Sequence, residues 1–199
     1  MLRVGSSYLS EFIDGILADS LSNVKIAKDT NRKILSLLVL KEIADNSPTH
    51  FYQQIETFQG VILQPLKDKN IHIRLAAGEA LSSCLIVMQQ RENQKKNDFY
   101  HRFLELIQEL PKDNHNESIH GYLIAINCFL NNYMEFCSSS MDSIYSLIRS
   151  YFNTKESYIK ESIIQIIPVI TRFMSRYAPS FLTKEYCIEV YGLHTISSN

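Results

Sequence analysis

The chain has 199 residues, of which 45% are apolar and 21% are charged, values typical of a folded globular protein. Its 20 lysines and arginines stand against 21 aspartates and glutamates and give a net charge of -1. This balance lacks both the basic excess that neutralises phosphates and the polybasic segments that attract membrane surfaces. We therefore expect no nucleic-acid partner.

The cysteines have none of the close spacings of a metal site or a redox-active pair. We interpret them as packed thiols in a reducing compartment, and we expect no metal and no cofactor. Residues 1–7 are too polar for a signal peptide, and no later stretch approaches the roughly 18 uninterrupted apolar residues of a membrane span. The sequence thus favours a cytoplasmic protein without direct membrane insertion. The cysteines are Cys84, Cys128, Cys137 and Cys187.

Apolar residues in the first half of the chain recur at the i, i+3, i+4, i+7 spacing of amphipathic helices, and strand alternation fails. The second of these stripes is broad enough to predict burial on most of the helix circumference. Pro48 suits the first turn of the third helix, where its missing N–H costs nothing. The predicted helices cover about 8–24, 34–44, 48–65 and 73–88, and a polar loop follows at 91–98.

The same spacing continues through the second half. Ser138 to Ser140 offers hydroxyl groups that could cap the start of a seventh helix, and Asn153 with Thr154 could cap an eighth. Pro179 opens a ninth. The predicted helices cover about 99–110, 119–133, 141–151 and 159–173.

A basic or polar residue begins every second stripe, and these positions reveal a repeat. Lys33, Arg74, His120 and Lys160 follow one another at spacings of 41, 46 and 40 residues. Two-helix units of about 40 to 47 residues are the period of HEAT arrays, whereas armadillo units have three helices. The pattern predicts an all-α fold, an α-α superhelix of about four two-helix HEAT units plus a partial fifth, forming a single solenoid over residues 1–199.

Apolar residues at both ends of the chain lack an obvious cover. A single helical hairpin cannot bury its own apolar face, so terminal units need polar caps or further units. We expect this solenoid to be part of a longer array, with these residues on exposed faces if nothing follows them. They are Leu9, Phe12, Ile16 and Leu17 at one end and Phe181, Tyr186 and Val190 at the other.

Several short motifs add a family resemblance. Phe51-Tyr52-Gln53-Gln54 and Gln90-Arg91-Glu92 stand on either side of the segment that holds Ile73-Arg74. In this order and spacing they resemble the N-terminal HEAT region of the target of rapamycin (TOR) kinases. The later Ile119-His120-Gly121 and Ile166-Ile167-Pro168 are similar to further parts of the same region. The resemblance covers about residues 30–185, is weaker between 93 and 116, and lacks the family's long insertion before the seventh helix.

The resemblance implies a scaffold. In the family, this region recruits other subunits, and the serine/threonine kinase domain lies far towards the C-terminus. The expected partners are a Raptor-type substrate-recruiting subunit, other components of the TOR complex and a second TOR chain in a dimer. The implied location is cytoplasmic, with endomembranes or the nucleus reached through the complex.

The residues themselves offer no catalytic motif. A kinase site needs a glycine-rich phosphate loop and metal-binding carboxylates, and the six glycines are too scattered to form such a loop. We therefore expect no enzyme activity from this chain. The alternative to a TOR scaffold is a free-standing HEAT adaptor unrelated to a kinase, and sequence downstream of residue 199 would separate the two.

The polar turns between paired helices are the candidate partner site. They recur about one unit apart, so a stacked solenoid places them on one ridge. Arg74 lies just after the first of these turns and is expected to pair with the turn acid of a neighbouring unit. The candidate ridge residues are Lys67, Asp68, Lys69, Lys112, Asp113, Lys155 and Glu156.

Overall fold

The structure is a computed structural model that describes residues 2–91 and 94–177. Every regular element in these ranges is a helix, which confirms the all-α prediction. The expected ninth helix at Pro179 lies outside the described residues. The α-helices are α1 (Leu2–Ile26), α2 (Thr30–Asn46), α3 (Pro48–Gln53), α4 (Ile55–Leu66), α5 (Ile71–Gln89), α6 (Gln94–Gln108), α7 (Asn116–Asn132), α8 (Met141–Ser150) and α9 (Ser157–Tyr177), with 3-10 helices η1 (Leu110–Asp113) and η2 (Met134–Ser140).

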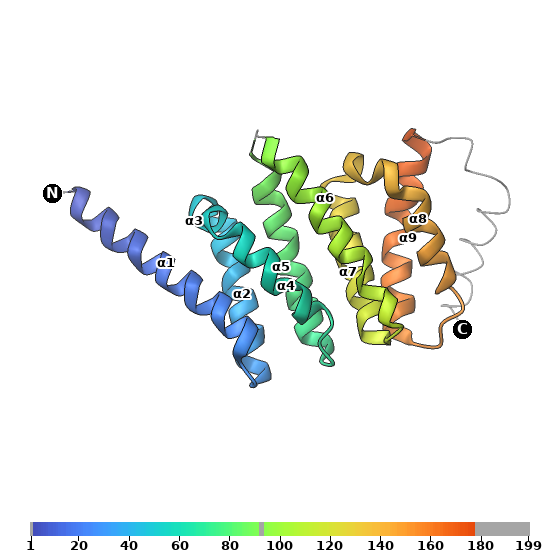
Figure 1. Cartoon of the computed structure of the whole chain (residues 1–199), viewed down its shortest axis with the longest axis horizontal. Coiled ribbons are helices and arrows are strands. Elements are labelled where there is room, and N and C mark those ends of the chain that lie inside the picture. The colour runs from blue at the N-terminus through green and yellow to red at the C-terminus, as the bar shows by residue number, and fades with distance from the viewer. Residues whose placement is uncertain (1, 92–93, 178–199) are drawn as a thin grey trace.

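The helices form two rows, as Figure 1 shows. Helices α1, α4, α6 and α8 make the front row, and α2, α5, α7 and α9 stand behind them. Consecutive helices of the rear row pack against each other in the order α2, α5, α7, α9. The predicted solenoid of four two-helix units is therefore present in the described residues.

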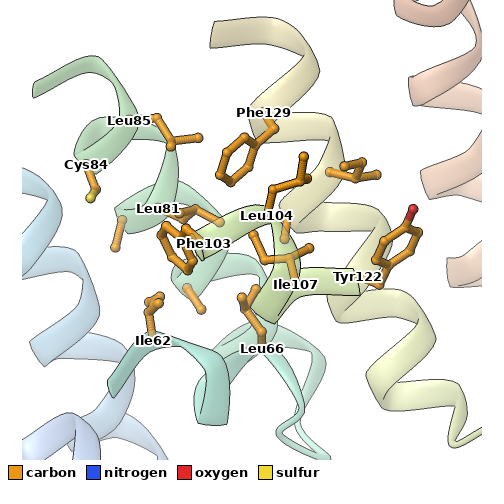
Figure 2. Close-up of a cluster of buried hydrophobic side chains, with 14 of the residues drawn as sticks. Ile62, Leu66, Leu81, Cys84, Leu85, Phe103, Leu104, Ile107, Tyr122 and Phe129 are labelled. Carbon is orange, nitrogen blue, oxygen red and sulfur yellow. The ribbon is translucent and has the colours of Figure 1, made fainter. Parts of the chain in front are cut away.

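One apolar core runs through the junction of both rows. Figure 2 shows its central part, where side chains from α4, α5, α6 and α7 point toward one another. Each unit completes the core of its neighbour, because a front helix also packs against the rear helix of the next unit, as α4 does against α7. Fully buried members of this cluster include Ile62, Leu66, Leu81, Leu85, Phe103 and Phe129.

Two helices begin with side-chain caps that satisfy otherwise unpaired backbone N–H groups. Asp29 Oδ2 accepts a hydrogen bond from Arg32 N at 3.0 Å, and Asn70 Oδ1 accepts one from His72 N at 2.9 Å. The caps expected from Ser138 to Ser140 are absent: Ser140 precedes α8 without a side-chain cap bond. Thr154 Oγ1 accepts from Glu156 N at 3.3 Å, so it shapes the turn before α9.

The third and fifth predicted helices differ from the structure in their bounds. The third divides at Gln54 into α3 and α4, because Gln54 N bonds to Phe51 O and the chain re-enters a helix at Ile55.

The loop expected at 91–98 is wrong for most of its length, since α6 begins at Gln94. Lys96 Nζ donates to Gln89 O at 3.2 Å and lies 5.0 Å from the Tyr133 ring. These contacts are polar, so apolar periodicity does not reveal this helical turn.

Helix α5 is the central element of the rear row. By length and composition alone it is apolar enough to cross a membrane, the one such helix in the described residues. In the fold, 67% of that apolar window is buried. The small side chains of Ala76, Ala77 and Ala80 let neighbouring helices approach it closely. Its apolar character is therefore accounted for by packing between α2 and α7.

The outer face of α1 is partly exposed, as the sequence predicts for two of its residues. Phe12 is 65% exposed and Leu9 is 59% exposed. The same expectation is wrong for Leu17, which is fully buried and joins the core. A helix turns by about 100° per residue, so Leu17 faces the neighbouring helices when Phe12 faces outward.

Gly121 marks a close backbone approach between units. A methyl group added to Gly121 of α7 would overlap the carbonyl oxygen of Leu66 at the end of α4. A backbone oxygen cannot move aside as a flexible side chain can. Glycine is therefore required at this position for α7 to seat against the preceding unit.

We predict that Gly121→Ala destabilises the chain by about 1–3 kcal/mol or more, because the new methyl group forces two helices apart. Gly60→Ala is the matched control. Nothing lies within 4 Å of a methyl group there, and alanine is the better helix former by about 1 kcal/mol. Urea unfolding should separate the two variants in opposite directions. Equal stability of both variants would contradict the close approach.

Candidate protein-interaction ridge

The turns that join the helices of each pair lie along one edge of the solenoid, the lower edge in Figure 1. They comprise residues 27–29, 67–70, 109–115 and 151–156. The predicted ridge residues all fall on the last three of these turns. Lys67 Nζ lies 3.8 Å from Asp113 Oδ2, so the second and third turns are in contact.

The second turn is fixed by Asp68. Its Oδ1 accepts from Asn70 N at 3.0 Å, and its Oδ2 accepts from Lys33 Nζ at 3.1 Å. Lys33 belongs to α2, so this ion pair ties the turn to the preceding unit. Both side chains are less than one quarter exposed, 24% for Lys33 and 21% for Asp68. The carboxylate is therefore occupied within the fold and is a poor candidate for a partner contact.

The third turn is fixed by Asp113. His115 N donates to Asp113 Oδ1 at 3.0 Å and Ser118 Oγ donates to Oδ2 at 2.8 Å. The bond from the His115 backbone is the main cause that holds the pKa of Asp113 below its ordinary value. Asn114 takes a left-handed conformation with φ of 57°, which asparagine adopts more readily than most residues. The turn therefore has a defined shape with its carboxylate ionised.

The ridge lysines differ in how they are engaged. Lys67 pairs with Asp113, and Lys112 Nζ lies close to Glu109 Oε1, at 2.6 Å. Lys69 and Lys155 are exposed, with no ion pair to the described residues. These two lysines are the ridge cations most available to a partner.

Arg74 does not pair with the acid of a neighbouring turn, and that expectation is wrong. Its Nη1 donates to the carbonyl oxygens of Asp68 at 2.7 Å and Lys69 at 3.1 Å. Its Nε donates to His120 Nδ1 at 2.8 Å. The guanidinium is also 5.3 Å from the ring centroid of Tyr158 on α9. Arg74 thus links three consecutive units from a buried position, with 2% of the residue exposed.

His120 is the buried partner of Arg74. Because its Nδ1 accepts from a guanidinium that cannot lose its proton, the neutral ring carries hydrogen on Nε2. Its ring centroid is 5.0 Å from that of Tyr158, in an edge-to-face arrangement. Burial, with the Arg74 charge as a second cause, lowers the pKa of His120 to about 4. The repeat spacing aligned Arg74 with His120 in sequence, but it did not show that they touch.

The described residues assemble no candidate metal centre. None of their His, Cys, Asp and Glu side chains form a group of three that could hold a metal ion. Cys84 and Cys137 are buried, and Cys128 lies with its Sγ 3.4 Å from Gly78 O. Burial raises the pKa of Cys128 to about 12, so its thiol remains protonated at neutral pH. Cys187 lies outside the described residues.

This geometry defines a class: an all-α repeat solenoid with rigid polar turns along one edge. No protein-family model matches the sequence. The curated relatives it matches include serine/threonine-protein kinases named TOR. The serine/threonine-protein kinase TOR of Arabidopsis thaliana is 28% identical over 185 residues, which is 92% of this chain and 8% of the relative.

Two further relatives give the same result. The serine/threonine-protein kinase TOR of rice, Oryza sativa subsp. japonica, is 32% identical over 153 residues, which is 76% of this chain and 6% of the relative. TOR2 of Saccharomyces cerevisiae is 26% identical over 190 residues, 92% of this chain and 8% of the relative. The chain therefore resembles a segment of TOR serine/threonine kinases, as the motifs suggested. It spans less than one tenth of the length of these relatives.

We predict that acid destabilises the fold through His120. Its pKa is about 4 in the folded chain and about 6.5 when unfolded. The unfolded chain therefore binds more protons between these values, and stability falls as pH drops from 6.5 towards 4, by on the order of 3 kcal/mol in total. His120→Asn keeps an acceptor for Arg74 without the titration, so its urea midpoint should fall less between pH 7 and pH 4.5. An unchanged slope in His120→Asn would show that His120 is not the group responsible.

Proposed function

We propose that the chain is a non-catalytic scaffold segment of a TOR-type kinase, built from HEAT units and acting through protein–protein contacts. The observation that carries this proposal is the similarity to TOR kinases over most of the chain. The architecture agrees with it, because the apolar side chains of the core are buried in contacts between units. What such a solenoid offers to other molecules is its turns and its outer faces.

The proposed partners are a Raptor-type substrate-recruiting subunit, other subunits of a TOR complex and a second TOR chain. In this proposal the segment works in the cytoplasm and reaches endomembranes or the nucleus as part of the complex. The kinase reaction belongs to the domain that TOR kinases carry elsewhere. The chain's own part is to hold a subunit in place.

The turn ridge is the proposed docking surface for such a subunit. Its turns are held by Asp68 and Asp113, so a partner meets a surface that needs little ordering on binding. Lys69 lies on the second turn and Lys155 on the fourth, and both side chains are exposed. Exposed charges of this kind steer association and fix orientation, and their effect falls as salt rises.

A free-standing HEAT adaptor is the competing function. It would share the solenoid but have no kinase domain. The sequence of the full-length transcript separates the two proposals. Further helical repeats followed by a kinase domain support the TOR segment, and a stop codon directly after a capping unit supports the adaptor.

We predict that reversing the charge of the two available ridge lysines weakens subunit capture. Lys69→Glu with Lys155→Glu, placed in the full-length TOR-type chain, should reduce co-precipitation of its Raptor-type subunit about tenfold at low salt, since attraction becomes repulsion. The reduction should shrink as salt rises. Both side chains are exposed, so far-ultraviolet circular dichroism of the 199-residue chain should not change.

The control reverses two cations near the opposite edge of the solenoid, Lys41→Glu with Arg172→Glu; because Lys41 pairs with Glu42 and Asp45, circular dichroism of this variant is checked as well. It has the same change in net charge and should leave capture within about twofold of the original, as expected of charges outside an interface. Capture that is unaltered by the ridge pair, or reduced equally by both pairs, would remove the turn ridge from the interface.

A further inference from the structure

A second surface lies on the outer side of the rear row. It is a groove of about 360 Å³ lined by residues in the ranges 71–82 of α5, 120–128 of α7 and 158–165 of α9. In Figure 1 this side faces away from the viewer, behind the front row. Side chains from three different units line it, so the stacked arrangement itself creates the groove.

The groove has an apolar floor. Leu75 of α5 is 45% exposed beside it, and Ile71 and Ile124 are only partly buried. Gly78 lies between them, and a methyl group there would overlap the Ile124 side chain. The absence of a side chain at Gly78 keeps α5 and α7 close and leaves the hollow above them open. Partly exposed leucine and isoleucine side chains that converge on a hollow offer a place for apolar groups.

The charges at the groove are all of one sign. Glu79 of α5 and Glu161 of α9 are exposed at its two sides. Within the described part of the chain neither has an ion-pair partner, and no lysine or arginine lines the groove. The guanidinium of Arg74, which contacts the lining residues His120 and Tyr158, is buried and bonded to turn carbonyls and to His120. An occupant therefore meets two uncompensated carboxylates around an apolar floor.

We propose that this groove binds a short segment of a partner protein in which apolar side chains alternate with lysine or arginine. The apolar side chains cover Leu75, Ile71 and Ile124, and the cations pair with Glu79 and Glu161. Charge complementarity selects this occupant: a phosphate backbone or an anionic lipid surface would be repelled by the same carboxylates. The site is separate from the turn ridge and does not depend on it.

Fluorescence anisotropy of the 199-residue chain tests the proposal. The probes are three short fluorescein-labelled peptides that share one pattern of leucines and differ in carrying lysine, glutamine or glutamate between them. The lysine peptide should bind saturably and most tightly, and the glutamate peptide should bind least. Glu79→Lys with Glu161→Lys should weaken the lysine peptide about tenfold and reverse the preference. Leu75→Ala should weaken all three peptides several-fold, because it removes part of the floor.

Controls separate the groove from general surface charge. Glu11→Lys with Glu105→Lys alters two exposed glutamates on front-row helices, and Leu106→Ala alters a leucine there that is 38% exposed. Neither control should change binding. If the double reversal at the groove impairs folding, Glu79→Gln with Glu161→Gln replaces it and should abolish the preference for lysine.

Three results would overturn the proposal. One is the absence of saturable binding by the lysine peptide. Another is an equal loss of peptide binding in the groove variants and in their controls, which would show that binding depends on general surface charge and not on the groove. The third is a dimer of the peptide-free chain in sedimentation velocity that Leu75→Ala dissociates, because a second copy would then be the occupant.

Discussion

The structure depends on one constraint: no helical pair in this chain can bury its apolar surface alone. Helix α5 shows it most directly, because 12 of its residues are buried and they face several directions around the helix. Helices α2 and α7 on its two sides, together with α4 of its own unit, cover them. The requirement fixes the close approach at Gly121, where α7 meets the end of α4. The stability of the solenoid, and the spacing and orientation of its units, follow from the same contacts between units.

Buried and partly buried polar groups make this stack specific as well as stable. Lys33 reaches Asp68 in the next unit, and Arg74 reaches His120 one unit further on. An apolar interface alone would tolerate sliding of one helix along another, whereas a charged group in the core must meet its partner. Because the core and these links are used in packing, the turns and outer faces remain for recognition. The proposed TOR scaffold and the acidic groove draw on these two different surfaces.

Much of the fold could be predicted from sequence because the apolar stripes are strong and the repeat is regular. For the same reason the sequence predicts that the turns at 67–70, 111–116 and 153–156 align on one edge. Apolar periodicity does not reveal the start of α6, because the side chains there make polar contacts, such as that of Lys96 with the Tyr133 ring. It does not reveal the ion pair of Asp68 with Lys33 either, because that contact is also polar. The role of Arg74 was misjudged, since spacing gives the alignment of units and does not tell which atoms meet. Binding by the ridge residues stays a prediction.

Hydrogen–deuterium exchange of the 199-residue chain tests the stacking account most directly. Amide protection reports local opening, and helices covered on both sides open least. The account predicts the slowest exchange in α5 and α7, which have rear-row neighbours on both sides, and faster exchange in α1 and α8. It also predicts that Gly121→Ala accelerates exchange in α4 and α7 first. Exchange in α1 or α8 as slow as that in α5 would contradict the claim that contacts between units hold the structure together.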